Sequence, residues 1–202
     1  MDIDIILEPD LDPKQINELG IKAEEYGINA IWTSNYFAHW DPFLSLVPLA
    51  QTTKKIKFGP LAVSPFEMHP LKIANSLITL NEMSQGRAQV AVGAGEGNIT
   101  AMGLNTPKKI VLAVREALEI IVMASKNNLE DQYDGEIFSV NLPCDYSWAN
   151  SSRPKVYGTA YKHMMMRMEG RIADGVYIGA TPPEIISPAT VAYTHLTLPT
   201  KA

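Results

Sequence analysis

One acidic residue, Glu96, stands among glycines directly after an apolar run, in the segment GAGEGN of residues 93–98. Glycine neighbours let a carboxyl approach a ligand without obstruction from adjacent side chains. In a partly dry site such a carboxyl has a raised pKa and acts as a proton donor. A solvated loop acid is the alternative interpretation. The glycine spacing departs from the dinucleotide fingerprint, and no helix is expected to open before Thr106, so a Rossmann-type site is disfavoured.

Two aromatic residues, Tyr36 and Trp40, follow an earlier apolar run. Both could flank or stack on a planar ligand ring, and both could equally close the top of a barrel. His39, between them, titrates near neutral pH and suits acid–base chemistry, although a surface loop histidine is the commoner case. His69 directly precedes Pro70, an arrangement typical of a helix start.

A third group of candidate residues opens a predicted helix in GTAYKH, residues 158–163. The first backbone N–H groups of a helix have no partner within the helix, so they bind anions, and Lys162 adds a positive charge. We therefore expect a phosphate site here, with a plain strand-to-helix turn as the alternative. The methionines at 164–166 and 168 are predicted to pack in the core.

Apolar runs that alternate with helix-periodic segments position these residues. The clearest helix start has Asp12 as N-cap, Pro13 in the first turn and Gln15 at the third position, and this helix ends at Gly27. Strands alternating with helices at this spacing indicate parallel βαβ units. The pattern fits both a barrel and an open doubly wound sheet. Strands are predicted at residues 3–7, 29–34, 55–63, 87–95, 153–159 and 173–180, and helices at 13–27, 42–52, 70–83, from 106 onward and at 161–170, with a polar insertion at 126–153.

Composition argues against several classes of function. The formal net charge is −5 and no run of lysine or arginine occurs, which disfavours a nucleic-acid surface. No apolar stretch reaches the length of about 20 residues that spans a bilayer. The acidic, strand-like N-terminus argues against a secretory signal. Cys144 is the single cysteine of the sequence, which excludes an internal disulfide. We therefore expect a cytoplasmic protein with neither nucleic-acid nor membrane partners.

The stretch from Phe58 to Gly97, FGPLAVSPFEMHPLKIANSLITLNEMSQGRAQVAVGAGEG, resembles the luciferase-like flavin- or deazaflavin-dependent oxidoreductases. A second stretch, RPKVYGTAYKHMMMRMEGRIADGVYIGA at 153–180, is similar to the methylene-tetrahydromethanopterin reductases of that superfamily. The resemblance covers residues 1–181. It implies an α/β fold, a luciferase-like TIM (β/α)₈ barrel, which binds reduced FMN or the deazaflavin coenzyme F420 at its C-terminal mouth.

The resemblance also implies roles for individual residues. In the deazaflavin branch a non-prolyl cis peptide after the third strand supports the ring, and the matching positions are Leu61 and Ala62. An acid after the fourth strand lies near the substrate in that branch, and Glu96 matches it. The exit of the fifth strand matches the phosphate-binding segment. The predicted site has Glu96 and Tyr36 as catalytic residues, no metal ligand, and cofactor contacts at Asn35, Trp40, Leu61, Ala62, Gly158, Thr159, Ala160 and Lys162.

One departure from the family pattern limits the chemistry. The sugar-phosphate dehydrogenases of the deazaflavin branch carry Asp-His after the second strand, where this chain has Asn35-Tyr36, so alcohol oxidation by their mechanism is not expected. Hydride transfer at a C=N or C=C bond, or monooxygenation, of a small organic substrate stays open. The alternative is a non-catalytic flavin-binding protein or an inactive fragment of such a barrel. An unrelated nucleotide-binding α/β protein is a third interpretation. A homo-oligomer is compatible with the full-length proteins of the family.

The length and the last residues predict an incomplete barrel. The chain has 202 residues, whereas a (β/α)₈ barrel typically needs about 250. A sixth helix is expected to begin after Pro182, but YTHLTLPT at 193–200 has no helical stripe and resembles the translation of a transposon-end adapter used in sequencing libraries. We therefore expect residues 1–192 to be the N-terminal portion of one barrel, about six of its eight βα units, and 193–202 to be a non-native tail. A short C-terminal strand is the alternative.

Overall fold

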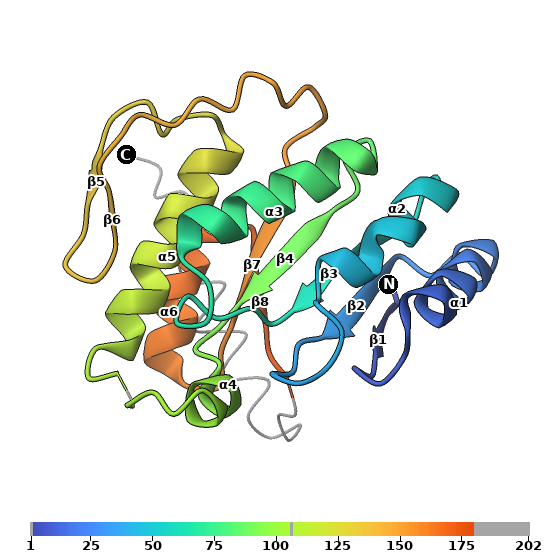
Figure 1. Cartoon of the computed structure of the whole chain (residues 1–202), viewed down its shortest axis with the longest axis horizontal. Coiled ribbons are helices and arrows are strands. Elements are labelled where there is room, and N and C mark those ends of the chain that lie inside the picture. The colour runs from blue at the N-terminus through green and yellow to red at the C-terminus, as the bar shows by residue number, and fades with distance from the viewer. Residues whose placement is uncertain (1, 106, 180–202) are drawn as a thin grey trace, which may run out of the picture.

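The strands of the main sheet follow one another in the order of the chain. They are β1 (Asp4–Leu7), β2 (Ala30–Ser34), β3 (Lys57–Leu61), β4 (Gln89–Val92), β7 (Lys155–Thr159) and β8 (Gly175–Tyr177). In the computed structural model, which describes residues 2–105 and 107–179, two three-stranded parallel sheets have the orders β1-β2-β3 and β4-β7-β8. The bridges Phe58–Ala88 and Val63–Val92 join the two sheets into one parallel arc (Figure 1).

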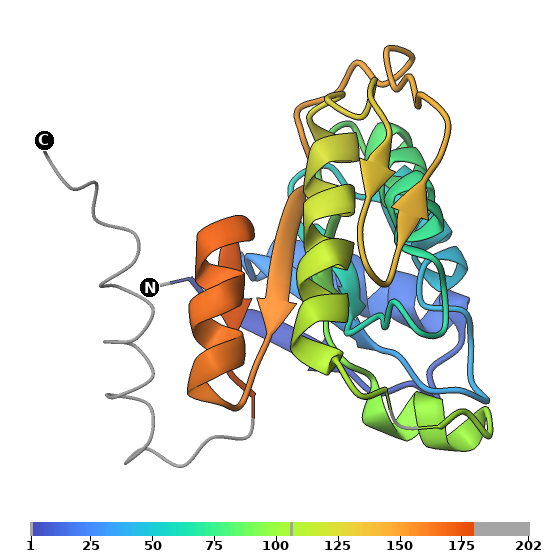
Figure 2. The same ribbon diagram turned by 90° about the vertical axis from the view of Figure 1, so that its left-hand side faces the viewer.

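The main helices follow one another around this arc. They are α1 (Pro13–Glu25), α2 (Val47–Thr52), α3 (Pro70–Met83), α5 (Ile110–Ser125) and α6 (His163–Ile172). Each contacts the next in chain order, α1 with α2, α2 with α3, α3 with α5 and α5 with α6 (Figures 1 and 2). A doubly wound sheet would place helices alternately on two faces. Sequential parallel strands with one succession of helices have the arrangement of a (β/α)₈ barrel.

The sheet is curved, so that strands that are not neighbours meet across its inside. Trp32 of β2 packs edge to face against Tyr157 of β7, with ring centroids 5.5 Å apart, although β3 and β4 lie between these strands. Ile6 of β1 and Tyr177 of β8 line the same small cavity. These contacts decide between the two folds that the sequence pattern allowed: the described residues form part of a barrel.

The hydrophobic core lies between the strands and the helices. Ile73 and Leu77 of α3 and Leu118 and Ile121 of α5 are completely buried, and they belong to one cluster with strand residues such as Val90. Burial of apolar area at about 25 cal/mol per Å² is the main stabilising contribution to such a layer. This core is the rigid frame that holds the loops at both ends of the strands.

Two helix starts follow the predicted caps. Asp12 and Gln15 form a reciprocal capping box at the start of α1, with Pro13 in the first turn. His69 caps α3, because its Nδ1 accepts the Leu71 N–H at 3.2 Å. The interpretation of His69 as a helix-start residue is therefore confirmed, and burial lowers the pKa of its imidazole.

Arg87 fastens the amino-terminal ends of the strands. Its guanidinium donates to the backbone carbonyls of Ala50, Thr53 and Ile56, each at 2.9 Å. Glu24 accepts backbone N–H groups from residues 54–56. Burial alone would raise the pKa of Glu24, but these hydrogen bonds hold it below its usual value. Arg87 lies in the Phe58–Gly97 stretch that resembles the family. Its hydrogen bonds stabilise the amino-terminal end of the barrel rather than the end at which the candidate loops meet.

Two segments differ in detail from the sequence prediction. Between residues 42 and 52 a single helix was expected, but the chain forms a 3₁₀ turn at Leu44–Leu46 before α2. The polar insertion expected at 126–153 contains a short hairpin of β5 (Tyr133–Asp134) and β6 (Ser139–Val140). Glu116, buried on α5, accepts the backbone N–H groups of residues 136–138 and attaches this hairpin to the frame.

Some predictions fall beyond the part of the chain that the structure describes. The sixth helix expected after Pro182 and the non-native tail expected at 193–202 both lie outside the described residues. Within residues 2–105 and 107–179, no helix has the length and apolar character required to cross a bilayer.

Candidate active site

A cavity of about 620 Å³ opens at the carboxyl ends of β2, β3, β4 and β7, a size suited to a small-molecule ligand. This is the end of the barrel at which the candidate loops were expected to meet. Seven of the ten predicted site residues line it: Asn35, Tyr36, Ala62, Glu96, Thr159, Ala160 and Lys162. Much of the remaining wall is apolar, formed by Phe37, Ala94, Ile110, Val111, Met164 and Met165.

The peptide bond between Leu61 and Ala62, at the end of β3, is cis. Asn35, from the loop after β2, holds the carbonyl groups of both residues. Its backbone N–H donates to the Leu61 oxygen at 3.3 Å, and its Nδ2 donates to the Ala62 oxygen at 3.0 Å. Ala62 lines the main cavity, whereas both residues line a smaller neighbouring cavity with Ser34 and Tyr177. Asn35 therefore fixes the backbone that forms this wall.

Glycines after β4 let three strand exits pack closely. A Cβ atom at Gly93 would lie 2.1 Å from Thr159 Oγ1, and one at Gly95 would lie 2.4 Å from the Ser64 Cβ. Gly95 also has a φ of 67°, in the left-handed region that other residues rarely adopt. The glycines of this segment thus bring the exits of β3, β4 and β7 together around the cavity.

Glu96 is the first residue of a short helix, α4 (Glu96–Ala101). The expectation that no helix opens before Thr106 was therefore wrong, and the next helix begins only at Ile110. The sequence gave little sign of α4, because a six-residue helix that includes Gly97 shows no apolar period. Glu96 lines the cavity but is exposed, so it lacks the dry surroundings expected for it. Sequential strand order, not the absence of a helix, excludes a Rossmann site.

The first turn of α6 forms the opposite wall. Lys162 is its N-cap residue and makes no side-chain capping hydrogen bond. The first intrahelical acceptor is the Lys162 carbonyl, which binds the Met166 N–H at 3.0 Å. Met166 is buried as predicted, but Met164 is 70% exposed and lines the cavity. The prediction that the methionine run packs in the core is thus correct for one face of α6 only.

Three predicted site residues lie outside the main cavity: Trp40, Leu61 and Gly158. The loop turns where the His39 N–H donates to the Tyr36 carbonyl at 3.4 Å, and Trp40 beyond it is 52% exposed. Gly158 is buried against α6, where a Cβ would lie 2.3 Å from the Glu169 Cδ. The absence of a side chain at Gly158 thus leaves room for the Glu169 side chain behind the strand.

Sequence reasoning missed Glu67, the acid in the loop between β3 and α3. Its carboxylate accepts hydrogen bonds from Asn35 Nδ2 at 2.6 Å and from the Ser64 backbone N–H at 2.7 Å. The Nδ2 of Asn98, on α4, donates to its second oxygen. The signal in the sequence was an acid in a loop that follows a strand, on the same end of the barrel as Glu96.

Two titratable groups near the cavity have shifted pKa values. Burial raises the pKa of Glu169, on the inner face of α6, to about 8, and the nearby Thr159 backbone N–H offsets this only in part. Neither carboxylate oxygen of Glu169 has a hydrogen-bond partner within the described residues. Burial, with smaller contributions from Tyr161 and Asp4, raises the pKa of Tyr177.

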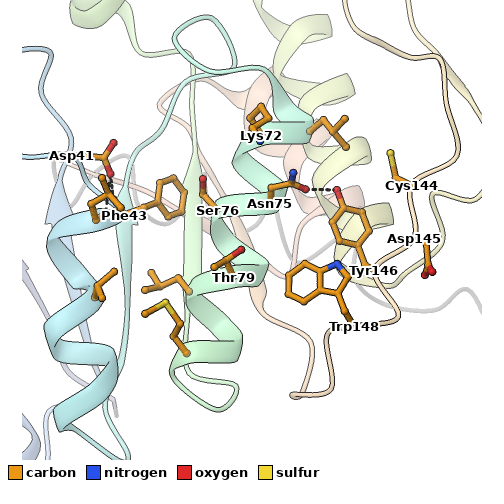
Figure 3. A pocket seen from close by; sticks show the side chains of 15 residues that line it. Asp41, Phe43, Lys72, Asn75, Ser76, Thr79, Cys144, Asp145, Tyr146 and Trp148 are labelled. Atoms are coloured by element: carbon orange, nitrogen blue, oxygen red, sulfur yellow. Dashed lines mark hydrogen bonds between the residues drawn. The ribbon is translucent and has the colours of Figure 1, made fainter.

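A second cavity, of about 700 Å³, lies on the outside of the barrel between α2, α3 and the loop at residues 144–148 (Figure 3). Its polar groups serve the fold. Tyr146 donates to Asn75 Oδ1 at 2.7 Å, and Asp41 accepts the N–H groups of Phe43 and Leu44. Among residues 2–105 and 107–179, no cluster of His, Cys, Asp or Glu could hold a metal ion. The mouth of the barrel is therefore the candidate site.

Known proteins match this chain over most of its length. The family described as luciferase-like monooxygenase matches residues 4–194. A 5,10-methylenetetrahydromethanopterin reductase of Archaeoglobus fulgidus is 30% identical over 177 residues, which cover 87% of this chain and 52% of the reductase. An F420-dependent glucose-6-phosphate dehydrogenase of Amycolatopsis mediterranei is 27% identical over 177 residues, which cover 81% of this chain and 52% of the dehydrogenase.

A solved structure is also similar to this chain over most of its length. The coenzyme F420 dependent tetrahydromethanopterin reductase from Methanopyrus kandleri superposes with a TM-score of 0.86 and 27% sequence identity, over 95% of this chain and 59% of that chain. The parallel βα arrangement, with its cavity at the carboxyl ends of the strands, places the chain in the class of βα-barrel proteins. The family follows from the match of the family model over most of the chain. The chain belongs to the luciferase-like monooxygenase family. It spans about half the length of the curated relatives it matches.

Proposed function

We propose that this chain is the cofactor-binding part of an oxidoreductase that uses F420 or FMN for hydride or oxygen transfer on a small organic substrate. The observation that carries the proposal is the convergence of seven predicted site residues in one cavity at the carboxyl ends of four strands. The names of the two relatives, a methylenetetrahydromethanopterin reductase and an F420-dependent dehydrogenase, support a redox function, and the second supports F420.

The cavity fits a planar ring with a phosphate-bearing side chain. Ala62, Ala160 and Met165 give apolar wall, which suits an aromatic ring system. The uncapped first turn of α6 together with Lys162 suits an anion. When bound, such a cofactor supplies hydride transfer or, as reduced FMN, reaction with dioxygen.

Several of the predicted site residues have distinct roles in this proposal. The Leu61–Ala62 backbone supports the ring, and Asn35 holds that backbone in place. Lys162 and the start of α6 bind the phosphate. Tyr36, at the cavity edge, orients the substrate, and Glu96 donates a proton to it. Position 36 lacks an imidazole that could take the proton of an alcohol, so we propose chemistry at a C=N or C=C bond, or monooxygenation.

The phosphate role of Lys162 is tested with FMN and riboflavin, which differ by the phosphate alone. In the Lys162→Ala variant the Kd for FMN is expected to rise about tenfold, because a charge-assisted contact contributes roughly 1.5 kcal/mol. The Kd for riboflavin is expected to stay within about twofold of wild type. Quenching of flavin fluorescence measures both, and the same titration is made with F420.

Lys54→Ala is the matched control for net charge. Lys54 lies at the amino-terminal end of the barrel, where its backbone N–H binds Glu24, and its loss is expected to leave both flavin Kd values unchanged. An equal rise for FMN and riboflavin in Lys162→Ala would contradict the phosphate role. A wild-type chain that binds neither F420 nor FMN would contradict the proposed function itself.

The proton-donor role of Glu96 is tested by single turnover. Wild-type and Glu96→Gln chains are mixed with reduced F420 and a cyclic imine, and the absorbance of oxidised F420 is followed. General acid catalysis contributes about 10²–10⁴-fold, so a loss of at least about 100-fold is expected in Glu96→Gln. The Kd for F420 is expected to stay within about twofold. Equal rates in the two chains would remove Glu96 from the mechanism.

A second candidate function is cofactor binding without turnover. It is favoured by the exposure of Glu96, which lacks the dry surroundings of a typical proton donor. Binding of F420 by the wild-type chain with no imine reduction and no oxygen-dependent turnover would support it. We also propose a cytoplasmic location, because a sequence with a single cysteine fits a reducing compartment. We propose self-association from the exposed Leu44 and Trp148 beside the outer cavity.

A further inference from the structure

We infer that Glu67 is a positioning residue at the carboxyl end of the barrel. Its hydrogen bonds fix two parts of the cavity relative to each other, the wall formed by the cis peptide and the helix that carries Glu96. The inference rests on the proposed function, because it concerns the same cavity. Glu67 does not line the cavity itself. It acts through three neighbours that come from three different strand exits.

Each contact of Glu67 joins a different segment. One carboxylate oxygen accepts both Asn35 Nδ2, at 2.6 Å, and the Ser64 N–H, at 2.7 Å. The other oxygen accepts Nδ2 of Asn98. Asn35 lies 32 residues away in the sequence and Asn98 lies 31 residues away. Glu67 thus connects the loops that follow β2, β3 and β4.

The contact with Asn35 reaches the cis peptide. The same Nδ2 group that donates to Glu67 also donates to the Ala62 carbonyl at 3.0 Å. The carboxylate therefore fixes the rotation of the Asn35 side chain, with its two amide hydrogens turned to Glu67 and Ala62. Asn35 and Ala62 both line the cavity wall, whereas Glu67 stands behind them.

The contact with Asn98 reaches the proposed proton donor. Asn98 is buried, with 7% of its surface exposed, in the first turn of α4, two residues after Glu96. A six-residue helix has little stability of its own, so a buried side-chain anchor decides its orientation. Holding Asn98 therefore holds Glu96 at the cavity edge.

The three N–H groups around the Glu67 carboxylate require a hydrogen-bond acceptor. Three N–H groups converge on two oxygens, and a carboxylate has only acceptors to offer. Within the described residues no lysine, arginine or histidine forms an ion pair with Glu67. The carboxylate is held by neutral donors alone, an arrangement in which one removed partner leaves the others unsatisfied.

The first test removes or opposes the anchor. Glu67→Ala deletes all three contacts, and Asn98→Asp places a second carboxylate against Glu67. Each is expected to raise the Kd for FMN or F420 about tenfold, in fluorescence titrations with whichever cofactor wild type binds. Hydrogen exchange without cofactor is expected to speed up at residues 61–67 in the first variant and at 96–101 in both.

The decisive variant exchanges the two groups. In Glu67→Gln/Asn98→Asp the glutamine oxygen still accepts from Asn35 and Ser64, and its amide donates to the new aspartate. The double variant is expected to bind cofactor within about twofold of wild type and to regain slow exchange at 96–101. A merely structural loss in Asn98→Asp would not be reversed by a second substitution.

Glu24→Ala is the matched control. Like Glu67, Glu24 accepts three N–H groups, here all from the backbone, but at the opposite end of the barrel. Its loss is expected to speed exchange at residues 54–56 and to leave the cofactor Kd unchanged. A wild-type chain that binds cofactor while Glu67→Ala and Asn98→Asp bind equally well overturns this inference alone. A double variant as weak as Asn98→Asp also overturns it, and a wild-type chain that binds neither cofactor overturns both proposals.

Discussion

Glu169 carries an ionisable group into the contact between α6 and β7. It is completely buried, and its carboxyl has a pKa of about 8 because burial disfavours the charged form. In the unfolded chain the same group titrates near its ordinary value of about 4.3. Between these two values the folded state holds a proton that the unfolded state has released. The stability contributed by this group is therefore fully present below about pH 4.3 and is lost as pH rises through 8.

A glutamine at this position is expected to remove that pH dependence. Glu169→Gln stays neutral throughout, so its free energy of unfolding relative to wild type should rise by up to about 1.4 kcal/mol per pH unit between pH 5 and 8. Urea unfolding at pH 5.5, 7 and 8.5 measures the difference, and groups common to both chains cancel. The raised pKa of Glu169 would be refuted by a difference that is the same at all three values.

Glu67 shows why a residue-level site is only partly readable from sequence. The candidates Glu96, Tyr36 and Lys162 were found because each follows an apolar run, and strand exits meet at one end of a barrel. The role of Glu67 comes from Asn35 and Asn98, which lie about 30 residues away on either side. No local pattern encodes such a convergence.

At the level of elements, β7 and α6 fit together through one glycine. A Cβ at Gly158 would lie 2.3 Å from the Glu169 Cδ and 2.5 Å from its Oε2. The strand therefore needs a residue without a side chain at the point where the helix presents a long one. Cofactor binding was the role predicted for Gly158. Its packing against Glu169 is a separate reason for a glycine at this position.

A double-mutant cycle tests that fit. Gly158→Ala is expected to lower the free energy of unfolding by about 1–3 kcal/mol, because the added methyl group overpacks a closed interface. In the Glu169→Ala background the same change is expected to cost less than about 0.5 kcal/mol, since the clashing carboxyl is gone. Urea unfolding of the four chains at pH 6 gives the coupling. Equal costs in both backgrounds would show that Gly158 serves another purpose.

The elements that were predicted correctly are those with a strong local signal. The start of α1 follows from Asp12, Pro13 and Gln15, and the buried strands follow from continuous apolar runs. The missed element, α4, follows an N-cap glycine with positive φ, Gly95, and is only six residues long. Its anchor is Asn98, a tertiary contact, so neither propensity nor periodicity could reveal it.

For the whole molecule, local patterns left two folds open and distant contacts decide between them. The alternation of strands and helices is common to open sheets and barrels. The pairing of Trp32 with Tyr157 across the sheet, and the sequential strand order, belong to a barrel. These are properties of strand arrangement in space, which no single segment specifies. The family resemblance supplied that information before the structure did, because it compares the whole pattern at once.

The position of Arg87 has a practical consequence for engineering. This one side chain donates to four backbone carbonyls at the end of the strands farthest from the cavity. The contacts of Arg87 that stabilise the barrel are therefore far from the residues that line the cavity. Among the described residues, none of 36–40 is a hydrogen-bond partner of Arg87, so these five positions can be randomised as a library while the Arg87 hydrogen bonds stay unchanged. Selection on such a library would explore new substrates from an unchanged foundation.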